Sequence, residues 1–225
     1  MMLLLGFKWL GNRAMDLRAH DTPVIFSYEE ALGYCVGDVL CDKDGISAAS
    51  IFMEMASALE AGWTETGGEA SGPSRTVSQL LSDLWLKYGE FISYNSYVIS
   101  KDPKVTDEIF EQLRHHPTQG GYWTTCAGVE IVALQDITKG YDSSAADHRS
   151  SLPMTPESHM IMYEFANGVS VTLRTSGTEP KIKFYTEIAG KPGQSKASLE
   201  LILHSFVDAL VEEMLQPTKY GLGRP

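Results

Sequence analysis

The residues best suited to chemistry form a short polar run in the last third of the chain, with the sequence RTSGT. Thr175, Ser176 and Thr178 carry hydroxyls, and Gly177 leaves the backbone uncovered, so consecutive N–H groups can surround a cluster of anionic oxygens. Arg174 adds a planar guanidinium whose paired N–H groups match two oxygens of a phosphate dianion. This combination predicts the binding of a phosphate group.

The charge around this run is opposite in sign to the charge of the whole chain. Arg174, Lys181 and Lys183 stand here against the carboxylate of Glu179, whereas the 225 residues hold 18 Lys and Arg against 29 Asp and Glu, a formal net charge of −11. A local excess of positive charge in an acidic protein indicates a bound anion. An ordinary hairpin turn with lysines on its solvated face has the same spacing, and spacing alone leaves both interpretations open.

Two alternating segments flank the run and predict the strands that hold it. Val169–Leu173 and Ile182–Ile188 place apolar side chains on one face and polar side chains on the other. Asn167-Gly168 favours a tight turn with positive φ angles between the first of these segments and another strand at His159–Phe165. The polar run is therefore expected between the second and third strands of an antiparallel meander.

Further elements of the second half complete the expected fold. Residues 128–137 predict another strand, Val105–His115 an amphipathic helix, and Ser195 begins a helical pattern that ends near Pro217. We therefore expect an α+β domain in which helices cover an antiparallel sheet.

The segment RTSGTEPKIKFY closely resembles the phosphate-binding loop in the C-terminal domain of the α-D-phosphohexomutases, the phosphoglucomutase and phosphomannomutase superfamily. In that family the loop binds the phosphate that is not being transferred. The resemblance implies this role for Arg174, Ser176, Gly177 and Thr178, and it adds Lys183, where the family often has a basic residue on the following strand.

A second resemblance lies in the first half. EEALGY, which follows GFKWLGN and a strand-like segment, resembles the sugar-binding loop of the family's third domain, usually written G-E-x-S. Glu29 would then hydrogen-bond sugar hydroxyls, although two carboxylates after a strand can also be a solvated turn. Ala31 replaces the usual serine, as in the branch that contains phosphopentomutases and glucose-1,6-bisphosphate synthases. Lys43 stands at the lysine of the family's K-D-G segment, which lies in the active-site cleft.

The first half predicts a mixed α/β arrangement. Pro23–Tyr28 reads as a buried strand, and Asp44 caps a helix over Ile46–Leu59 that is apolar enough to be buried. Thr64–Arg75 reads as a flexible loop, and Val77–Tyr88 as a helix.

The division between the two halves is expected at Asp102-Pro103, after an extended segment at Phe91–Ser100. The resemblance therefore implies the end of the third, α/β mutase domain in residues 1–102 and the C-terminal, α+β domain in residues 103–225.

Composition excludes several classes of protein. The acidic balance argues against a role in binding nucleic acid, and no segment is long and apolar enough for a membrane span. Cys35, Cys41 and Cys126 fit neither a redox pair nor a zinc spacing, so we expect reduced thiols in a cytoplasmic protein.

The family's catalytic motifs do not occur in this sequence. The phosphoserine loop, T-A-S-H-N-P, and the magnesium loop, D-G-D-x-D-R, are both missing, so no catalytic residue and no metal ligand are expected in these 225 residues. The resemblance implies that Mg²⁺ and a sugar bisphosphate activator serve the full-length enzyme. It also implies N-terminal domains of the same polypeptide as partners.

Two hypotheses follow from these motifs. The first is the C-terminal portion of a cytoplasmic phosphoglucomutase or phosphopentomutase, an enzyme that moves a phosphoryl group between positions of a sugar phosphate through a phosphoserine and a bisphosphate intermediate. The second is a non-catalytic phosphosugar-binding or regulatory module. The sugar remains open among ribose, deoxyribose, glucose and mannose phosphates.

Overall fold

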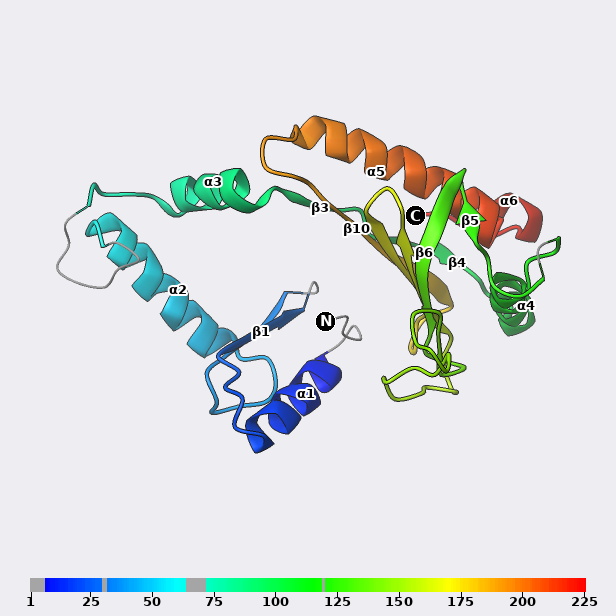
Figure 1. Ribbon diagram of the computed structural model, residues 1–225, viewed down its shortest axis with the longest axis horizontal. Coiled ribbons are helices and arrows are strands. Elements are labelled where there is room, and N and C mark those ends of the chain that lie inside the picture. Colours follow the sequence, from blue (N-terminus) through cyan, green and yellow to red (C-terminus); the bar gives the residue numbers. More distant parts are fainter. Residues whose placement is uncertain (1–6, 30–31, 64–71, 119) are drawn as a thin grey trace. The chain divides into compact units, whose positions relative to one another are not determined.

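The computed structural model describes residues 7–29, 32–63, 72–118 and 120–225 (Figure 1). The chain forms two compact units, Met1–Asp83 and Leu84–Pro225, and each is described here by itself. Ala31 and most of the loop predicted at Thr64–Arg75 lie outside the described residues. None of the described helices is long and apolar enough to pass through a bilayer.

The first unit contains helix α1 (Phe7–Ala19), a hairpin of β1 (Phe26–Glu29) and β2 (Gly33–Val36), and helix α2 (Gly45–Glu60). Asp44 caps α2 as predicted, because its carboxylate accepts hydrogen bonds from the N–H groups of Ile46 and Ser47. Helix α2 packs against β2, and α1 packs against β1.

Burial in the first unit differs from the prediction. The strand predicted at Pro23–Tyr28 begins only at Phe26, and its side chains are half-buried or exposed. The predicted burial of α2 is also wrong for the described residues: Ile46 is 82% exposed and Met53 62% exposed, and only Leu59 of the helix is buried. The apolar pattern indicates a face that can be covered, but within this unit α2 has only the small hairpin on one side.

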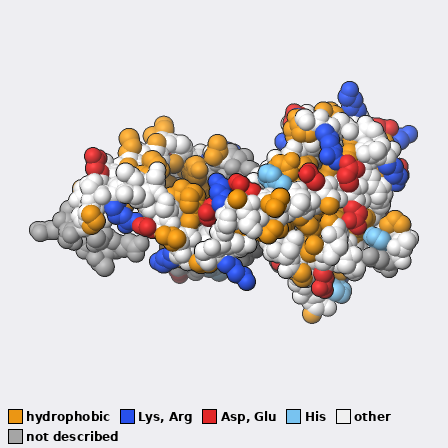
Figure 2. All heavy atoms as spheres, turned by 90° about the horizontal axis from the view of Figure 1, so that it is seen from above, with side chains coloured by type: hydrophobic (Ala, Val, Ile, Leu, Met, Phe, Trp, Pro, Cys, Tyr) orange, Lys and Arg blue, Asp and Glu red, His pale blue; other side chains and the backbone are white. Residues whose placement is uncertain are grey.

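An apolar groove of about 760 Å³ remains between α2 and the hairpin. Apolar side chains of this unit are visible at its surface, on the left of Figure 2. The groove is lined by Phe26, Tyr34, Val36, Gly45, Ala48, Ala49, Ile51, Phe52, Met53 and Met55.

The compact units divide earlier than the boundary predicted at Asp102-Pro103. Helix α3 (Val77–Tyr88) spans the division, and Gly89, with φ of +88°, follows it. The extended segment predicted next consists of two short strands, β3 (Phe91–Ser93) and β4 (Ser96–Ile99), which both pair with β10 (Lys181–Ala189). This pairing joins them to the second unit.

The second unit is built on an eight-stranded antiparallel sheet with the order β3-β10-β9-β8-β6-β5, in which β4 also pairs with β10 and β7 with β6. The remaining strands are β5 (Thr125–Cys126), β6 (Val129–Asp136), β7 (Tyr141–Asp142), β8 (Met160–Phe165) and β9 (Val169–Thr175).

The predicted meander is confirmed. Gly168 turns the chain between β8 and β9 with φ of +83°, and the side chain of Asn167 accepts a hydrogen bond from Val169 N at 3.1 Å. Strand β9 then pairs with β10, with Arg174 opposite Lys183.

Helices cover this sheet (Figure 1). The predicted amphipathic helix is α4 (Pro103–Arg114), and Asp102 is its N-cap. Helix α5 (Lys196–Leu210) follows Ser195, packs on β10 and β3, and continues through a π-helical turn (Val211–Leu215) to α6 (Pro217–Tyr220). The predicted α+β fold with a helix-covered antiparallel sheet is thus confirmed. Its core combines apolar residues of both layers, among them Ile109, Phe110, Leu113, Leu173, Ile182, Leu203 and Leu210.

Candidate functional site

The predicted phosphate loop connects the ends of β9 and β10 and presents free backbone donors. Ser176 N donates to the carbonyl of Lys181 at 2.9 Å, which closes the loop. Within the described part of the chain, the N–H groups of Gly177 and Thr178 donate no hydrogen bond. A Cβ added at Gly177 would meet no atom within 4 Å, so packing within the chain does not require glycine there. The loop therefore offers open space beside two uncommitted donors.

Arg174 lies beside this loop at the end of β9. Its Nη2 donates to the hydroxyl of Tyr185 at 3.0 Å, and its Cζ lies 5.2 Å from the centroid of the Tyr185 ring. Nε of Arg174 is buried and has no hydrogen-bond partner among the described residues. The guanidinium is therefore oriented by one aromatic ring, while Nη1, which has no partner among the described residues, remains available to an anion.

The two lysines of the loop region differ in how firmly they are paired. Lys181 Nζ lies 2.7 Å from Oε1 of Glu179 and 4.1 Å from the centroid of the Tyr97 ring, whereas Lys183 Nζ is 3.9 Å from Oε2 of Glu179. The hydrogen bond from Lys181 lowers the pKa of Glu179 and raises the pKa of the lysine, so this pair stays ionised at neutral pH. Lys183 is held more loosely, and it shares a face of the sheet with Arg174.

The predicted sugar-binding residues form an ion pair in the first unit. Lys43 Nζ lies 2.5 Å from Oε1 of Glu29, whose side chain is only 8% exposed. The hydrogen bond to Glu29 raises the pKa of Lys43. A Cβ added at Gly33 would come within 3.0 Å of both side chains, which explains the glycine opposite Glu29. The pair thus presents a lysine, 52% exposed, over a carboxylate that it neutralises.

A cluster that sequence reasoning missed lies between α4 and the sheet. Arg114, 2% exposed, donates from Nε and Nη2 to the carboxylate of Asp136 at 2.6 and 3.3 Å, and the Tyr122 hydroxyl donates to Oδ2 of Asp136 at 3.0 Å. Burial opposes the charge of Arg114, but the hydrogen bonds with Asp136 raise its pKa. Burial and the same carboxylate raise the pKa of Tyr122.

The sequence carried a weak signal of this cluster. Arg114 falls one helical turn after Phe110 on the buried face of α4, and Asp136 ends an apolar strand. A charged residue on the apolar face of a helix suggests a buried partner of opposite charge, but the sequence pattern does not identify that partner.

Magnesium does not fit the described residues. Across the described ranges, no three His, Cys, Asp or Glu side chains come close enough together to hold a metal ion. No step involving the metal is therefore assigned to these residues.

The chain is similar in sequence to several curated enzymes. No protein-family model matches the chain. The chain is 43% identical over 218 residues to glucose 1,6-bisphosphate synthase of Homo sapiens, an alignment that covers 96% of the chain and 33% of that protein. It is 41% identical over 220 residues to phosphopentomutase of Homo sapiens, with 97% and 34% covered.

The chain is a homologue of the phosphohexomutases. It is also 35% identical over 226 residues to a probable phosphoribomutase of Schizosaccharomyces pombe, with 99% of the chain and 36% of that protein covered. This phosphohexomutase homologue therefore spans about one third of the length of the curated relatives that it matches.

The fold of this homologue is found in a solved structure. The open form of parafusin, a phosphoglucomutase from Paramecium, superposes with a TM-score of 0.62 at 14% sequence identity, over 98% of the chain and 34% of parafusin. At this identity the comparison concerns the fold. The predicted relationship to the superfamily is confirmed, whereas the roles of individual site residues stay predictions.

Proposed function

We propose that this chain is the C-terminal, substrate-binding portion of a phosphoglucomutase-like or phosphopentomutase-like enzyme. The full enzyme moves a phosphoryl group between positions of a sugar phosphate through a phosphoserine and a bisphosphate intermediate. Within this chain, the loop from Arg174 to Thr178 binds the phosphate that is not transferred. Residues 1–102 belong to the third domain of the enzyme, and residues 103–225 form the C-terminal domain.

The observation that carries the proposal is the state of this loop. Among the described residues, the N–H groups of Gly177 and Thr178 donate no hydrogen bond, a Cβ added at Gly177 would meet no atom within 4 Å, and Nε of Arg174 has no partner. A phosphate dianion accepts several such hydrogen bonds at once, and charge-assisted bonds of this kind are strong. Lys183 adds positive charge on the same face of the sheet.

Glu29 and Lys43 would bind the sugar. A carboxylate and an ammonium group held 2.5 Å apart provide an acceptor and a donor to neighbouring hydroxyls, and their mutual hydrogen bond fixes both side chains before a sugar arrives. This preorganisation reduces the entropy lost on binding.

The chemical step would depend on residues outside this chain. N-terminal domains of the same cytoplasmic polypeptide would supply the nucleophilic serine and the Mg²⁺ ligands. A sugar bisphosphate would act there as the activator. The exposed apolar groove of the first unit supports this proposal, because a groove lined by side chains such as Phe52 and Met53 gains stability when another part of the protein covers it.

Mapping the 5′ end of the transcript tests the proposal directly. We expect an upstream reading frame that encodes a serine loop like T-A-S-H-N-P and an acidic loop like D-G-D-x-D-R. A transcript that starts at Met1, together with a soluble monomer whose first hundred residues resist proteolysis, would overturn the proposal and favour a non-catalytic phosphosugar-binding module.

Ligand binding tests the role of the phosphate loop. The relatives are named for pentose and glucose phosphates, so glucose 1-phosphate and ribose 1-phosphate are the ligands to titrate, by calorimetry and by the ¹H–¹⁵N spectrum of the chain. We expect the amide signals of Gly177 and Thr178 to shift on titration. Unchanged signals at saturating sugar phosphate would contradict the assigned role.

A further inference from the structure

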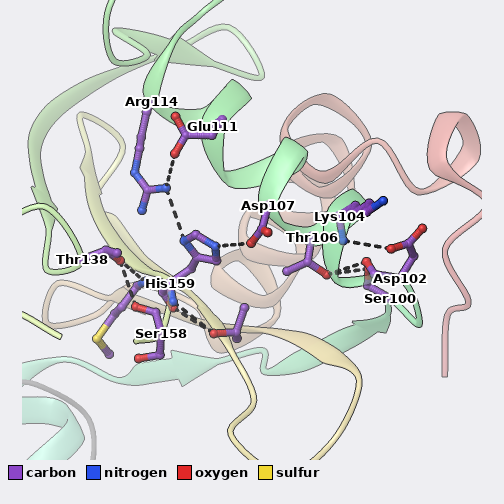
Figure 3. A network of polar contacts seen from close by, with 12 residues as sticks. Ser100, Asp102, Lys104, Thr106, Asp107, Glu111, Arg114, Thr138, Ser158 and His159 are labelled. Atoms are coloured by element: carbon purple, nitrogen blue, oxygen red, sulfur yellow. Dashed lines mark hydrogen bonds and ion pairs between the residues drawn. The ribbon is translucent and has the colours of Figure 1, made fainter. Parts of the chain in front are cut away.

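His159 immediately precedes β8, and its ring fills the space between two charged residues of α4 (Figure 3). Nε2 of the ring is 2.9 Å from Oδ1 of Asp107, and Nδ1 is 3.3 Å from Nη1 of Arg114. Both ring nitrogens are therefore engaged by side chains of a single helix.

The chemistry of these two neighbours selects one form of the ring. The Arg114 guanidinium can only donate, so Nδ1 must accept with its lone pair. The Asp107 carboxylate can only accept, so Nε2 must carry the proton. This arrangement corresponds to the neutral ring protonated at Nε2.

The surroundings hold the ring in place. Phe110, which is fully buried, stacks on the ring with the centroids 4.5 Å apart and the planes inclined by 10°. Arg114 is itself fixed by Asp136 and by Glu111, whose Oε1 lies 3.0 Å from Nη1. The ring thus links α4 to the residue that immediately precedes β8.

The backbone of His159 is bonded directly to the residue that begins the phosphate loop. His159 N donates to Oγ1 of Thr175 at 3.1 Å, and Thr175 N donates to the carbonyl of His159 at 3.0 Å. Thr175 stands between Arg174 and Ser176 in the chain. These two hydrogen bonds couple the position of His159 to that of Thr175, the residue between Arg174 and the loop.

We propose that His159 is a positioning residue for the phosphate loop, and that its neutral ring, held between Asp107 and Arg114, fixes Thr175 in the geometry that binds phosphate. This inference rests on the proposed function of the loop. Loss of the two ring hydrogen bonds should therefore weaken phosphate binding.

The charged groups around the ring come from α4, from β6 and from the turn that follows β6. Helix α4 contributes Asp107, Glu111 and Arg114, and β6 contributes Asp136 behind Arg114. Nζ of Lys139 lies 3.8 Å from Oε1 of Glu111, so the lysine partly offsets the negative charge that Glu111 places near the ring. From β9 the contact is Thr175, which does not titrate.

Two variants of the 225-residue chain test the positioning role. His159→Phe keeps the stacking on Phe110 but removes both hydrogen bonds, whereas His159→Gln offers one acceptor and one donor and cannot be charged at moderate pH. We expect His159→Phe to weaken glucose 1-phosphate binding about three- to tenfold at pH 7.5, the range that one or two lost hydrogen bonds would give. His159→Gln should stay within about twofold of wild type, by the same scale.

Calorimetry with glucose 1-phosphate at pH 7.5 measures both variants against wild type. Wild-type affinity in a folded His159→Phe chain, or equal losses in His159→Phe and His159→Gln, would overturn the positioning role.

Spectroscopy distinguishes this failure from failure of the proposed function. Long-range ¹H–¹⁵N correlation should report the ring protonated at Nε2 at pH 7.5, and a ring protonated at Nδ1 would overturn the inference. If the wild-type chain binds no sugar phosphate, the proposed function fails. The positioning role can still be tested without ligand, from the amide chemical shifts of Gly177 and Thr178. They should move in His159→Phe and not in His159→Gln, and unchanged shifts would contradict it.

Discussion

Arg174 donates a hydrogen bond from Nη2 to the hydroxyl of Tyr185 at 3.0 Å, and its guanidinium carbon lies 5.2 Å from the centroid of the same ring. One aromatic side chain therefore both supports and orients the cation beside the loop. The orientation keeps Nε free of any partner among the described residues.

Removal of this guanidinium is expected to weaken phosphate binding. Arg174→Ala should reduce the affinity for glucose 1-phosphate by about 1.5–3 kcal/mol, because a charge-assisted pair is lost. Arg174→Lys should recover only part of this loss, since a point charge does not reproduce the planar fork. Calorimetry on this chain measures both changes.

Tyr185→Phe is the matched control for Arg174. It keeps the ring beneath the guanidinium and removes only the hydroxyl that accepts from Nη2. We expect a smaller loss than for Arg174→Ala. Unchanged affinity in both Arg174 variants would identify the loop as an ordinary hairpin turn.

The isolated chain is expected to show no mutase turnover. With glucose 1-phosphate or ribose 1-phosphate, Mg²⁺ and a bisphosphate primer, a coupled assay should give no rate above background, because the sequence lacks the phosphoserine and magnesium loops. Human phosphopentomutase in the same assay is the positive control. Turnover that persists through rigorous purification would refute this expectation.

The buried ion pair of the second unit should be important for its stability. Asp136→Asn leaves the buried Arg114 charge with the half-exposed Glu111 as its remaining counterion, and we expect the free energy of unfolding to fall by about 3 kcal/mol. Urea denaturation followed by Trp fluorescence measures this change. Tyr122→Phe, which removes one hydrogen bond to the same carboxylate, should cost about 1 kcal/mol.

A double variant distinguishes the ion pair from simple packing. Arg114→Met combined with Asp136→Asn should be more stable than Asp136→Asn alone, because no unpaired buried charge remains. If Asp136→Asn changes the free energy of unfolding by less than the control Tyr122→Phe, the ion pair does not contribute as expected.

The N-terminus of α2 should respond to pH through Asp44. Hydrogen bonds from the Ser47 side chain and from the N–H of Ile46 lower the pKa of Asp44. A carboxyl whose pKa is lower in the folded state stabilises the fold above its unfolded pKa, and this stabilisation is lost as the pH falls through the folded pKa. The helix should therefore fray on acidification.

Amide exchange at Ile46 and Ser47 measures this fraying residue by residue. Asp44→Asn retains an oxygen that can accept the capping bonds but does not titrate, so its exchange should lack the acid-dependent increase. Identical acid dependence in the parent chain and in Asp44→Asn would assign the effect to other carboxyls.

Local patterns in the sequence were sufficient for the hairpins. Asn167-Gly168 between two alternating segments predicted the turn from β8 to β9, and the alternation around the polar run predicted β9 and β10. These features depend on neighbouring residues alone, so a single sequence reveals them.

Non-local pairing could not be predicted in the same way. Arg114 is 22 residues from Asp136 in the sequence, and His159 is 52 residues from Asp107, and nothing in the spacing identifies these partners. The predicted burial of α2 was wrong for a related reason: an apolar stripe reports that a face can be covered, but not whether the same unit covers it. The proposed roles of Glu29 and Lys43 rest on the resemblance, to which the structure adds their ion pair.

The interruption between β3 and β4 has a consequence for association between molecules. Both short strands lie against β10, and at Tyr94 and Asn95 the chain leaves the regular ladder, where the Asn95 side chain accepts from Thr186 N at 2.8 Å. At the other edge of the sheet, β5 has only two residues. A foreign strand needs a long, regular row of free N–H and C=O groups to add to a sheet. The long strands of this domain are interior, so its edges make poor templates for aggregation.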